Sequence, residues 1–172
     1  ILAVGGGSVA DSAKGIGLGL AHGRDPWEMI ATKTMPTKQF PVAVLLTLAA
    51  AGSEMSFSHV ITNPELQLKR SLNHDLLRPV FAFINPELTY TVSPYQTACG
   101  IVDIMMHTME RYFVPNADTD LTDRLAEGLL VAVKNAGKVA MEEPDNYEAR
   151  ATLAWASSLS HNGLTGCGKQ YL

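Results

Sequence analysis

The sequence has little cysteine, no basic run and no long apolar run, and each shortage excludes a class of protein. Its two cysteines, Cys99 and Cys167, stand in different contexts, which excludes a disulfide framework and suits a reducing cytoplasm. Lysine and arginine number 13 against 17 acidic residues and are scattered, so we expect no nucleic-acid partner. No apolar stretch approaches the roughly 20 residues of a membrane span, so we expect no membrane partner.

What remains is an ordinary globular composition. The chain has 172 residues, of which 47% are hydrophobic, and can therefore bury a substantial core. It starts at Ile1 inside a predicted buried strand and stops at Leu172 soon after a predicted helix. We therefore expect an internal fragment of a longer protein, with some groups of its site outside the chain.

A glycine run near the start separates a short apolar run from a predicted helix. Residues 5–7 are glycine, and the helix runs from Ser8 to near Gly23. Backbone without Cβ atoms can approach an anion closely, and a helix N-terminus adds unpaired N–H groups and the positive end of its dipole. The run also fits G-x-G-x-x-A, a weak dinucleotide fingerprint, so phosphate binding and a plain turn both stay open. The predicted apolar face of the helix consists of Val9, Ala13, Ile16 and Leu20.

The rest of the first half predicts strands and turns. Residues 40–48 and 80–84 are apolar runs typical of parallel strands buried on both faces. Residues 58–63 and 66–72 predict a β-hairpin. Small residues and hydroxyls follow the first run, where an open α/β sheet binds ligands, although Ser53 could equally cap a helix there. The fold class is therefore α/β.

The second half predicts only helices. The cap signals place Asp145 with Glu148 as a capping box. The boundary falls near residue 92, which gives an α/β domain at 1–92 and a helical domain at 93–172. The three predicted helices span residues 94–112, 119–141 and 145–160.

The first of these helices contains a carboxylate and an imidazole four residues apart. Asp103 and His107 project from one face about one turn apart, so they can share a divalent cation or simply hydrogen-bond to each other. Apolar neighbours nearly all round predict that Asp103 is buried and needs a partner. Glu110, three residues after His107, is expected to be either a charge on the helix surface or an acceptor of a hydrogen bond from the imidazole of His107.

The remaining histidines show no ligand spacing, and no Gly-x-Ser-x-Gly elbow suggests a serine nucleophile. We expect each of them to be a helix-terminal or surface residue: His22, His59, His74 and His161.

Four motifs stand in a specific order along the chain, namely GGGSxxDxAK from Gly5, AAGSE from Ala50, PELT from Pro86 and GxxDxxxHxxExY from Gly100. Together they resemble the iron-containing (group III) alcohol dehydrogenases. The butanol dehydrogenase and NADPH-dependent aldehyde reductase branch is the one most similar at residues 102–103, 106–108, 124–128 and 142–147. The resemblance covers nearly the whole chain. It departs at Asn85, where the family usually has aspartate, although an amide can still cap the turn.

The resemblance implies a cofactor groove and a metal site. It makes Asp103 and His107 two ligands of a divalent ion, Fe²⁺ or Zn²⁺, with no other catalytic residue, and it implies two further histidine ligands beyond Leu172, so His161 is not one of them. The domain at 1–92 becomes a partial dinucleotide-binding domain and the one at 93–172 the start of a metal-binding domain. Lys69, on the second arm of the predicted hairpin, would by default be a solvated surface lysine. The resemblance instead makes it a cofactor contact. The implied contacts with NAD or NADP are Gly5, Gly6, Gly7, Ser8, Thr47, Ser56, Lys69, Leu88 and Thr91.

The function implied is hydride transfer between NAD(P)(H) and a small alcohol or aldehyde such as butanol or butyraldehyde, in a cytoplasmic homodimer. The glycine loop and the Asp103 helix would then form two walls of one cleft. Two alternatives remain, a nucleotide-binding module without turnover and a lyase similar to dehydroquinate synthase. The turn at residues 51–54 and the pair Asp103 and His107 favour the dehydrogenase by resemblance.

Overall fold

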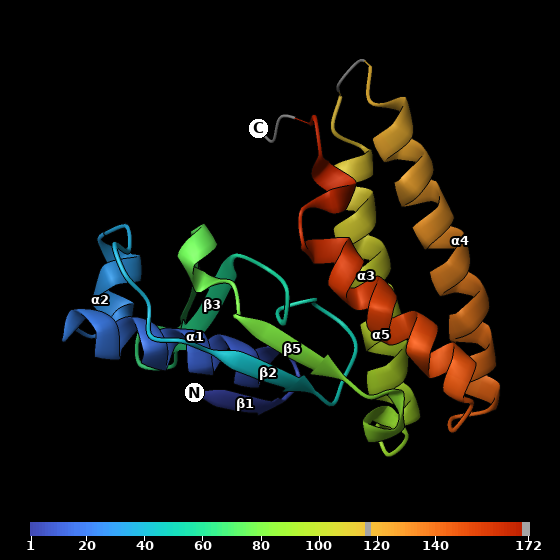
Figure 1. The fold of residues 1–172 in the computed structure, drawn as a ribbon, viewed down its shortest axis with the longest axis horizontal. Helices are drawn as coiled ribbons and strands as arrows, with labels where there is room; N and C mark the ends of the chain where they lie inside the picture. Colours follow the sequence, from blue (N-terminus) through green and yellow to red (C-terminus); the bar gives the residue numbers. More distant parts are fainter. Residues whose placement is uncertain (116–117, 170–172) are drawn as a thin grey trace. The chain divides into compact units, whose positions relative to one another are not determined.

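The structure is a computed structural model that describes residues 1–115 and 118–169 (Figure 1). The chain forms two compact units, one made of Ile1–Leu46 and Ser53–Phe83 and the other of Thr47–Gly52 and Ile84–Leu172. The first combines strands with helices, which confirms the predicted α/β class. The domain boundary near residue 92 stays a prediction, because compactness alone does not establish separate domains.

The first unit contains a sheet in the strand order β1-β2-β5. These strands are β1 (Leu2–Gly5), β2 (Ala43–Leu46) and β5 (Phe81–Ile84). Strands β2 and β5 lie within predicted strands, and β1 ends at Gly5, one residue past the apolar run at the start of the chain. Strand β1 pairs in parallel with β2, and the arrows of all three strands point the same way (Figure 1). Glycines after β1 and Asn85-Pro86 after β5 end these strands, as expected for residues that disrupt ladder pairing.

Helix α1 (Gly7–His22) follows β1 directly and packs against the sheet. Its buried face differs from the predicted one, since Val9, Ile16 and Leu20 are all exposed. The buried face instead carries alanines and glycines, and a Cβ on Gly17 would lie only 3.0 Å from the carbonyl oxygen of Phe40. Small side chains therefore bring this helix close to its neighbours. The core between helix and sheet consists of Ala3, Ala10, Ala13, Val42 and Val44.

The predicted hairpin is present as β3 (Ser58–Asn63) and β4 (Leu68–Asn73), which pair antiparallel. It packs on α1, and helix α2 (Pro26–Ala31) contacts β4. Ser53 does not cap a helix, because residues 51–56 form turns. The apolar core under the hairpin consists of Leu18, Met29, Ile30, Leu72 and Leu77.

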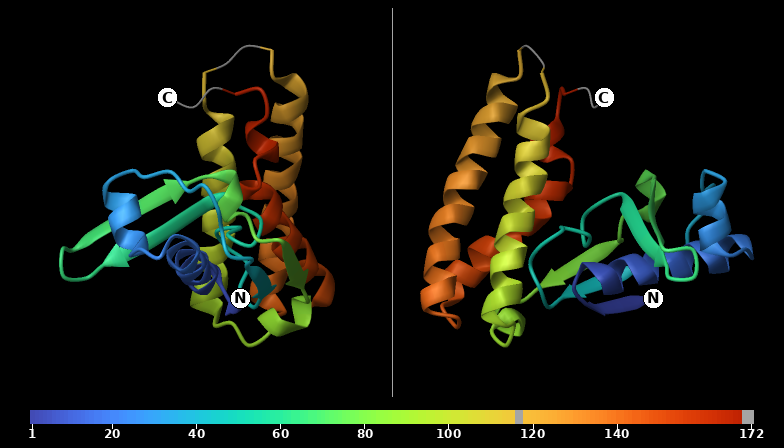
Figure 2. Two further views of the ribbon diagram at one scale, coloured as in Figure 1. Left: turned by 60° about the vertical axis from the view of Figure 1, so that its left-hand side comes forward. Right: turned by 180° about the vertical axis from the view of Figure 1, so that it is seen from behind.

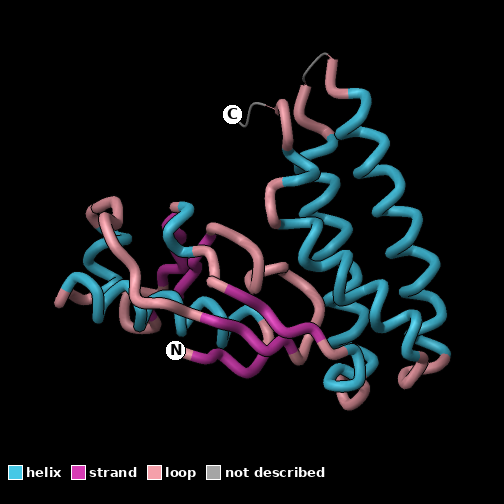
Figure 3. The backbone as a smooth tube through the Cα atoms, in the orientation of Figure 1, coloured by secondary structure: helices cyan, strands magenta, loops and turns pink. Residues whose placement is uncertain are grey.

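The second unit packs three long helices against one another, and Figures 2 and 3 show them side by side. They are α3 (Pro94–Tyr112), α4 (Asp120–Glu142) and α5 (Tyr147–His161), close to the predicted spans. Short 3₁₀ turns precede and follow them at η2 (Pro86–Thr89) and η3 (Leu164–Gly166). Their shared core consists of Ile104, Val133, Ala140, Ala149, Leu153 and Ala156.

The start of α5 differs in detail from the prediction. The cap is Asn146, whose side chain accepts a hydrogen bond from the backbone of Ala149, and not Asp145. Asp145 and Asn146 are equally good caps, so the sequence could not choose between neighbours. Asn85 behaves as predicted, since its side chain accepts from the backbone N–H of Glu87 at the start of η2.

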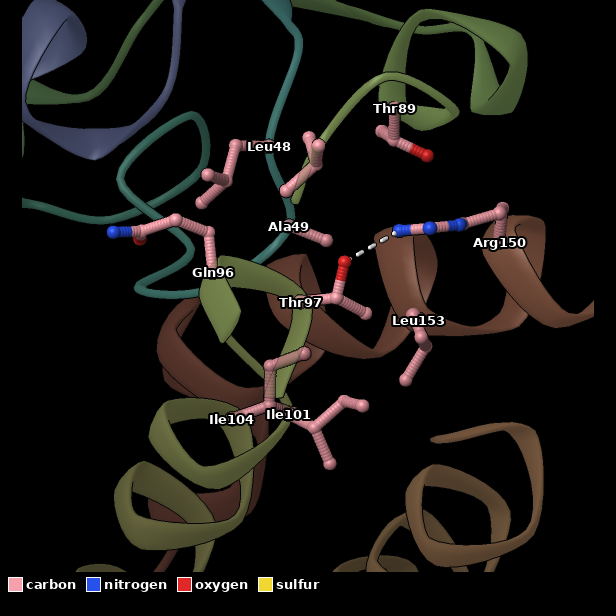
Figure 4. A pocket seen from close by; sticks show the side chains of 10 residues that line it. Leu48, Ala49, Thr89, Gln96, Thr97, Ile101, Ile104, Arg150 and Leu153 are labelled. Carbon is pink, nitrogen blue, oxygen red and sulfur yellow. Dashed lines mark hydrogen bonds between the residues drawn. The ribbon is translucent and has the colours of Figure 1, made fainter. Parts of the chain in front are cut away.

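A buried arginine joins α5 to α3. Arg150 donates from Nη1 to the hydroxyl of Thr97 at 3.1 Å (Figure 4). Its Nε donates to the carbonyl of Pro144 at 2.7 Å. Burial lowers the pKa of Arg150 from its usual value. These bonds compensate part of the cost of desolvating the guanidinium and fix the start of α5 on α3.

The segment after β2 is held by close backbone contacts. A Cβ on Gly100 would collide with the carbonyl oxygen of Ala49, so only glycine lets α3 approach this segment. The N–H of Ala50 donates to the hydroxyl of Ser157 on α5 at 3.1 Å. Gly52 has a φ of +64°, a left-handed backbone conformation that favours glycine, and it lies against the carbonyl of Ser157.

Candidate functional site

The predicted metal-binding pair lies on one face of α3. Oδ1 of Asp103 is 3.7 Å from Nε2 of His107, too far for a direct hydrogen bond. The direct hydrogen bond between Asp103 and His107, which was the alternative to metal binding, is therefore not present. A carboxylate oxygen and an imidazole nitrogen face each other across a gap, and both atom types bind divalent iron and zinc.

The surroundings of His107 favour its neutral form. Burial lowers the pKa of His107 below its usual value, against the opposing attraction of Asp103, and the nearby Arg111 lowers it further. On the other ring nitrogen, Nδ1 lies 3.9 Å from a carboxylate oxygen of Glu110, whose side chain is 72% exposed. A neutral imidazole is the form that binds a metal ion, so the electrostatics suit a ligand.

The expectation that Asp103 is buried is wrong. Its side chain is 44% exposed, because Val102 and Met106 on the same helix are themselves more than half exposed. The helix is apolar nearly all round in sequence, but only the side carrying Ile104 and Thr108 faces the core. Exposure removes the argument that Asp103 must have a partner, and leaves its carboxylate accessible.

His161 lies against the predicted ligand His107. The two ring centroids are 4.3 Å apart with the planes at 86°, an edge-to-face arrangement. Nη2 of Arg111 lies 3.5 Å from Nδ1 of His161, while Nη1 of Arg111 donates to the carbonyl oxygen of His107. His161 ends α5, as expected of a helix-terminal histidine, but its contact with α3 spans more than fifty residues and left no local signal.

Of the other histidines, His59 contradicts its prediction. His59 is fully buried, and neither ring nitrogen has a hydrogen-bond partner among the described residues. Burial lowers the pKa of His59. The other two are helix-terminal as predicted, since His22 ends α1 and His74 caps the 3₁₀ turn η1 (Asp75–Leu77).

The glycine run leads into α1 as predicted. Gly5 ends β1, Gly6 is the N-cap, and Gly7 and Ser8 form the first turn. Within residues 1–115 and 118–169, no side chain caps this N-terminus, and its first turn carries no acidic residue. Its first N–H groups therefore have no side-chain acceptor and suit a phosphate.

Asp11 and Lys14, the two charged residues of the motif that begins at Gly5, form a buried hydrogen-bond network that the sequence pattern did not predict. Nζ of Lys14 donates to the hydroxyl of Ser53 and to the carbonyls of Ser56 and Ser58. Asp11 accepts from the hydroxyl of Ser53 and from the N–H of Val60. Burial lowers the pKa of Lys14 to about 8, opposed chiefly by Asp11. This network holds α1 to the segment that enters the hairpin.

The predicted cofactor contacts divide between the two units. Ser56 is buried, and its hydroxyl oxygen lies 3.3 Å from Nζ of Lys14, so it is engaged inside the first unit. Lys69 is exposed on β4 opposite Thr62. Thr47, Leu88 and Thr91 belong to the second unit, where Leu88 and Thr91 are exposed. The role of all nine residues in cofactor binding stays a prediction.

The donor set fits a divalent ion in part. Asp103 and His107 supply two suitable atoms, but the part of the chain that the structure describes holds no group of three or more histidine, cysteine or carboxylate side chains able to hold a metal. Catalytic zinc normally takes three protein ligands. The described residues therefore account for two ligands.

Two further observations concern the whole described chain. Both cysteines are exposed free thiols, which agrees with the absence of a disulfide framework. Each described helix is too short or too polar to cross a bilayer.

Comparison with known proteins identifies the family. Residues 1–86 match the family described as iron-containing alcohol dehydrogenase, and residues 97–170 match its C-terminal part. The chain is 46% identical to NADH-dependent butanol dehydrogenase A of Clostridium acetobutylicum, covering 98% of this chain and 43% of that protein. It is 39% identical to the NADPH-dependent aldehyde reductase YqhD of Escherichia coli, covering 98% and 44%.

The fold agrees with these relatives. The crystal structure of NADH-dependent butanol dehydrogenase A from Thermotoga maritima superposes with a TM-score of 0.94 at 35% identity, covering 98% of this chain and 42% of that one. The chain thus spans less than half the length of the relatives it matches. On both its sequence and its fold, the chain belongs to the iron-containing alcohol dehydrogenase family.

Proposed function

We propose that the protein catalyses reversible hydride transfer between NAD(H) or NADP(H) and a small primary alcohol or aldehyde, such as butanol and butyraldehyde. The observation that carries the proposal is the pair Asp103 and His107, whose Oδ1 and Nε2 atoms lie 3.7 Å apart on α3. Relatives named for butanol, for aldehyde, and for NADH or NADPH support the substrate and cofactor class. Assembly as a homodimer belongs to the same proposal.

Each residue has a separate task in this proposal. Asp103 and His107 would hold a divalent ion, Fe²⁺ or Zn²⁺, as ligands and not as acid or base. The bound ion would act as a Lewis acid on the substrate oxygen, and the nicotinamide would supply or accept the hydride. The burial that lowers the pKa of His107 keeps its imidazole neutral and ready to bind.

The nucleotide would be held by the start of α1 and by further residues elsewhere in the chain. At the N-terminus of α1, which includes Gly6, Gly7 and Ser8, no side chain among the described residues caps the helix. A pyrophosphate would accept hydrogen bonds from the backbone N–H groups there. The remaining proposed cofactor contacts are Gly5, Thr47, Ser56, Lys69, Leu88 and Thr91.

The test is metal-dependent oxidation of NADH and of NADPH with butyraldehyde by the full-length protein, first stripped of metal and then reconstituted with Fe²⁺ or Zn²⁺. Asp103→Ala and His107→Ala are expected to abolish both turnover and tight metal binding. Met106→Gln is the matched control, since Met106 is 54% exposed on the same helix. Full activity in the two ligand variants would contradict the proposal.

A second candidate function is nucleotide binding without turnover. It is favoured by the absence of a three-ligand metal cluster among residues 1–115 and 118–169. Isothermal titration of the 172-residue chain with NADPH, beside an aldehyde assay, separates the two. Binding without turnover supports this candidate for the chain alone, and measurable turnover rejects it.

A further inference from the structure

The side chain of His161 is fixed from three directions in the helical unit. It ends α5, so its backbone belongs to a packed helix. A Cβ on Gly52 would lie 2.8 Å from the Cβ of His161, so the segment before Ser53 lies directly against it. The third constraint is the guanidinium of Arg111, whose Nη2 lies 3.5 Å from Nδ1 of the ring.

Arg111 links this histidine to the backbone that carries His107. The arginine is 8% exposed, and its Nη1 donates to the carbonyl oxygen of His107 one turn earlier on α3. A guanidinium has donors and no acceptor, so in this contact Arg111 is the donor and Nδ1 of His161 the acceptor. Arg111 therefore contacts both the ring of His161 and the backbone of His107 on α3.

The ring of His161 in turn restricts the ring of His107. The centroids are 4.3 Å apart with the planes nearly perpendicular, so rotation of His107 about its Cβ–Cγ bond would drive its edge into the neighbouring ring. Neither Asp103 at 3.7 Å nor Glu110 at 3.9 Å is close enough to hold the imidazole by a direct hydrogen bond. Among the described residues, His161 supplies an aromatic ring that packs edge-to-face with the imidazole of His107.

We propose that His161 is a positioning residue that holds the imidazole of His107 in the orientation in which it binds the metal ion. The inference rests on the proposed function, in which His107 is a ligand. His161 acts through His107 and is not itself assigned as a ligand. Mutation of a residue that orients a metal ligand typically lowers metal affinity about 10- to 100-fold.

The test compares His161→Ala, which removes the ring, with His161→Phe, which keeps an aromatic ring and removes the nitrogens. Metal affinity of the full-length protein is measured by competition with a chelator, using Zn²⁺. We expect His161→Ala to weaken binding about 10-fold and His161→Phe less than about 3-fold. The matched control is His74→Ala, in the other unit, with affinity unchanged. Thermal melting of each variant separates loss of affinity from loss of folding.

A second readout needs no metal. In the metal-free protein with ¹³C-labelled histidines, the ring Cε1–H signal of His107 is expected to shift in His161→Ala, because it loses the ring current of its neighbour, and to shift less in His161→Phe. An unmoved His107 signal in His161→Ala, or Zn²⁺ affinity equal to that of the unchanged protein, overturns the inference. Equal losses in the alanine and phenylalanine variants also overturn it, since the ring contact would not be the cause.

Failure of the proposed function would look different. If Asp103→Ala bound Zn²⁺ as tightly as the unchanged protein, the ligand assignment would fall. The ring signal of His107 in the metal-free protein would still decide whether His161 fixes its orientation.

Discussion

The ammonium of Lys14 lies 3.0 Å from the hydroxyl oxygen of Ser53, 39 residues further along the chain. Lys14 is fully buried, and its other acceptors include the carbonyl of Ser58 at 2.7 Å. The carboxylate of Asp11 lies 3.7 Å away. A buried charge in such a network is costly to leave half-paired, so the network ties the stability of the first unit to a single side chain.

Replacing Lys14 by methionine is expected to destabilise the protein by about 3 kcal/mol, because the acceptors and Asp11 lose their partner while the volume is roughly kept. Guanidinium chloride denaturation measures the change. Lys138→Met is the control, since Lys138 is exposed on α4 and should change stability by less than about 0.5 kcal/mol. A loss for Lys14→Met no larger than the control's would show that the network contributes nothing.

The buried ring of His59 predicts sensitivity to acid. Burial lowers the pKa of His59 in the folded protein, and of the facing charges Asp11 raises it and Lys14 lowers it. Just below the ordinary histidine pKa of about 6.5 the unfolded chain therefore binds more protons than the folded one, so stability falls as the pH falls.

The measurement is the free energy of unfolding at pH 7 and pH 5. His59 is expected to contribute a loss of at most about 1.4 kcal/mol per pH unit, which His59→Leu should remove. His22→Leu, which changes a helix-terminal histidine, should retain the loss. An identical slope in His59→Leu and the unchanged protein would refute the prediction.

Two helical glycines predict opposite effects of alanine. A Cβ on Gly100 would strike the carbonyl oxygen of Ala49, a backbone atom that cannot move away freely, whereas a Cβ on Gly128 meets nothing within 4 Å. Gly100→Ala is expected to lower the melting temperature by several degrees. Gly128→Ala should stabilise the protein by about 0.5–1 kcal/mol, because alanine favours a helix interior. Similar shifts for both variants would contradict the close approach of Ala49 to α3.

One face of the sheet is apolar and exposed, and it predicts dye binding. Leu2, Val4, Phe81 and Phe83 are each more than half exposed, on the face opposite the one that Ala3 and Val44 turn toward α1. The 172-residue protein is expected to increase the fluorescence of an anilinonaphthalene sulfonate dye in its folded state. Phe81→Thr together with Phe83→Thr should remove most of the signal. Leu121→Thr, on exposed α4, is the control, and an equal loss there would place the dye elsewhere.

The order of strands and helices could be predicted because it depends on local signals. Glycines after an apolar run, Asn-Pro after another and Ser93-Pro94 mark the boundaries of β1, β5 and α3. The same signals misplaced the cap of α5 by one residue, since Asp145 and Asn146 are about equally good N-cap residues. They also assigned the wrong face to α1, because glycine and alanine carry little hydrophobic signal although they pack closest.

The candidate site was predictable only where its residues are neighbours in sequence. The spacing of Asp103 and His107 on one helix places them together in any α-helix. Burial depends on tertiary packing, so the sequence pattern predicted neither the exposure of Asp103 nor the burial of His59. The contacts of His161 with His107 and of Lys14 with Ser53 join distant segments, and no local spacing encodes them.

The placement of Asp103 and His107 on a single helix also bears on the order of folding. The two ligands are four residues apart, so no loop has to close before they meet, and the pair exists as soon as α3 forms. The contact of His161 with this pair has to wait until α4 and α5 have returned the chain to α3. The two proposed ligands are therefore brought together by local helix formation, whereas the ring contact that orients His107 requires a tertiary contact between distant segments.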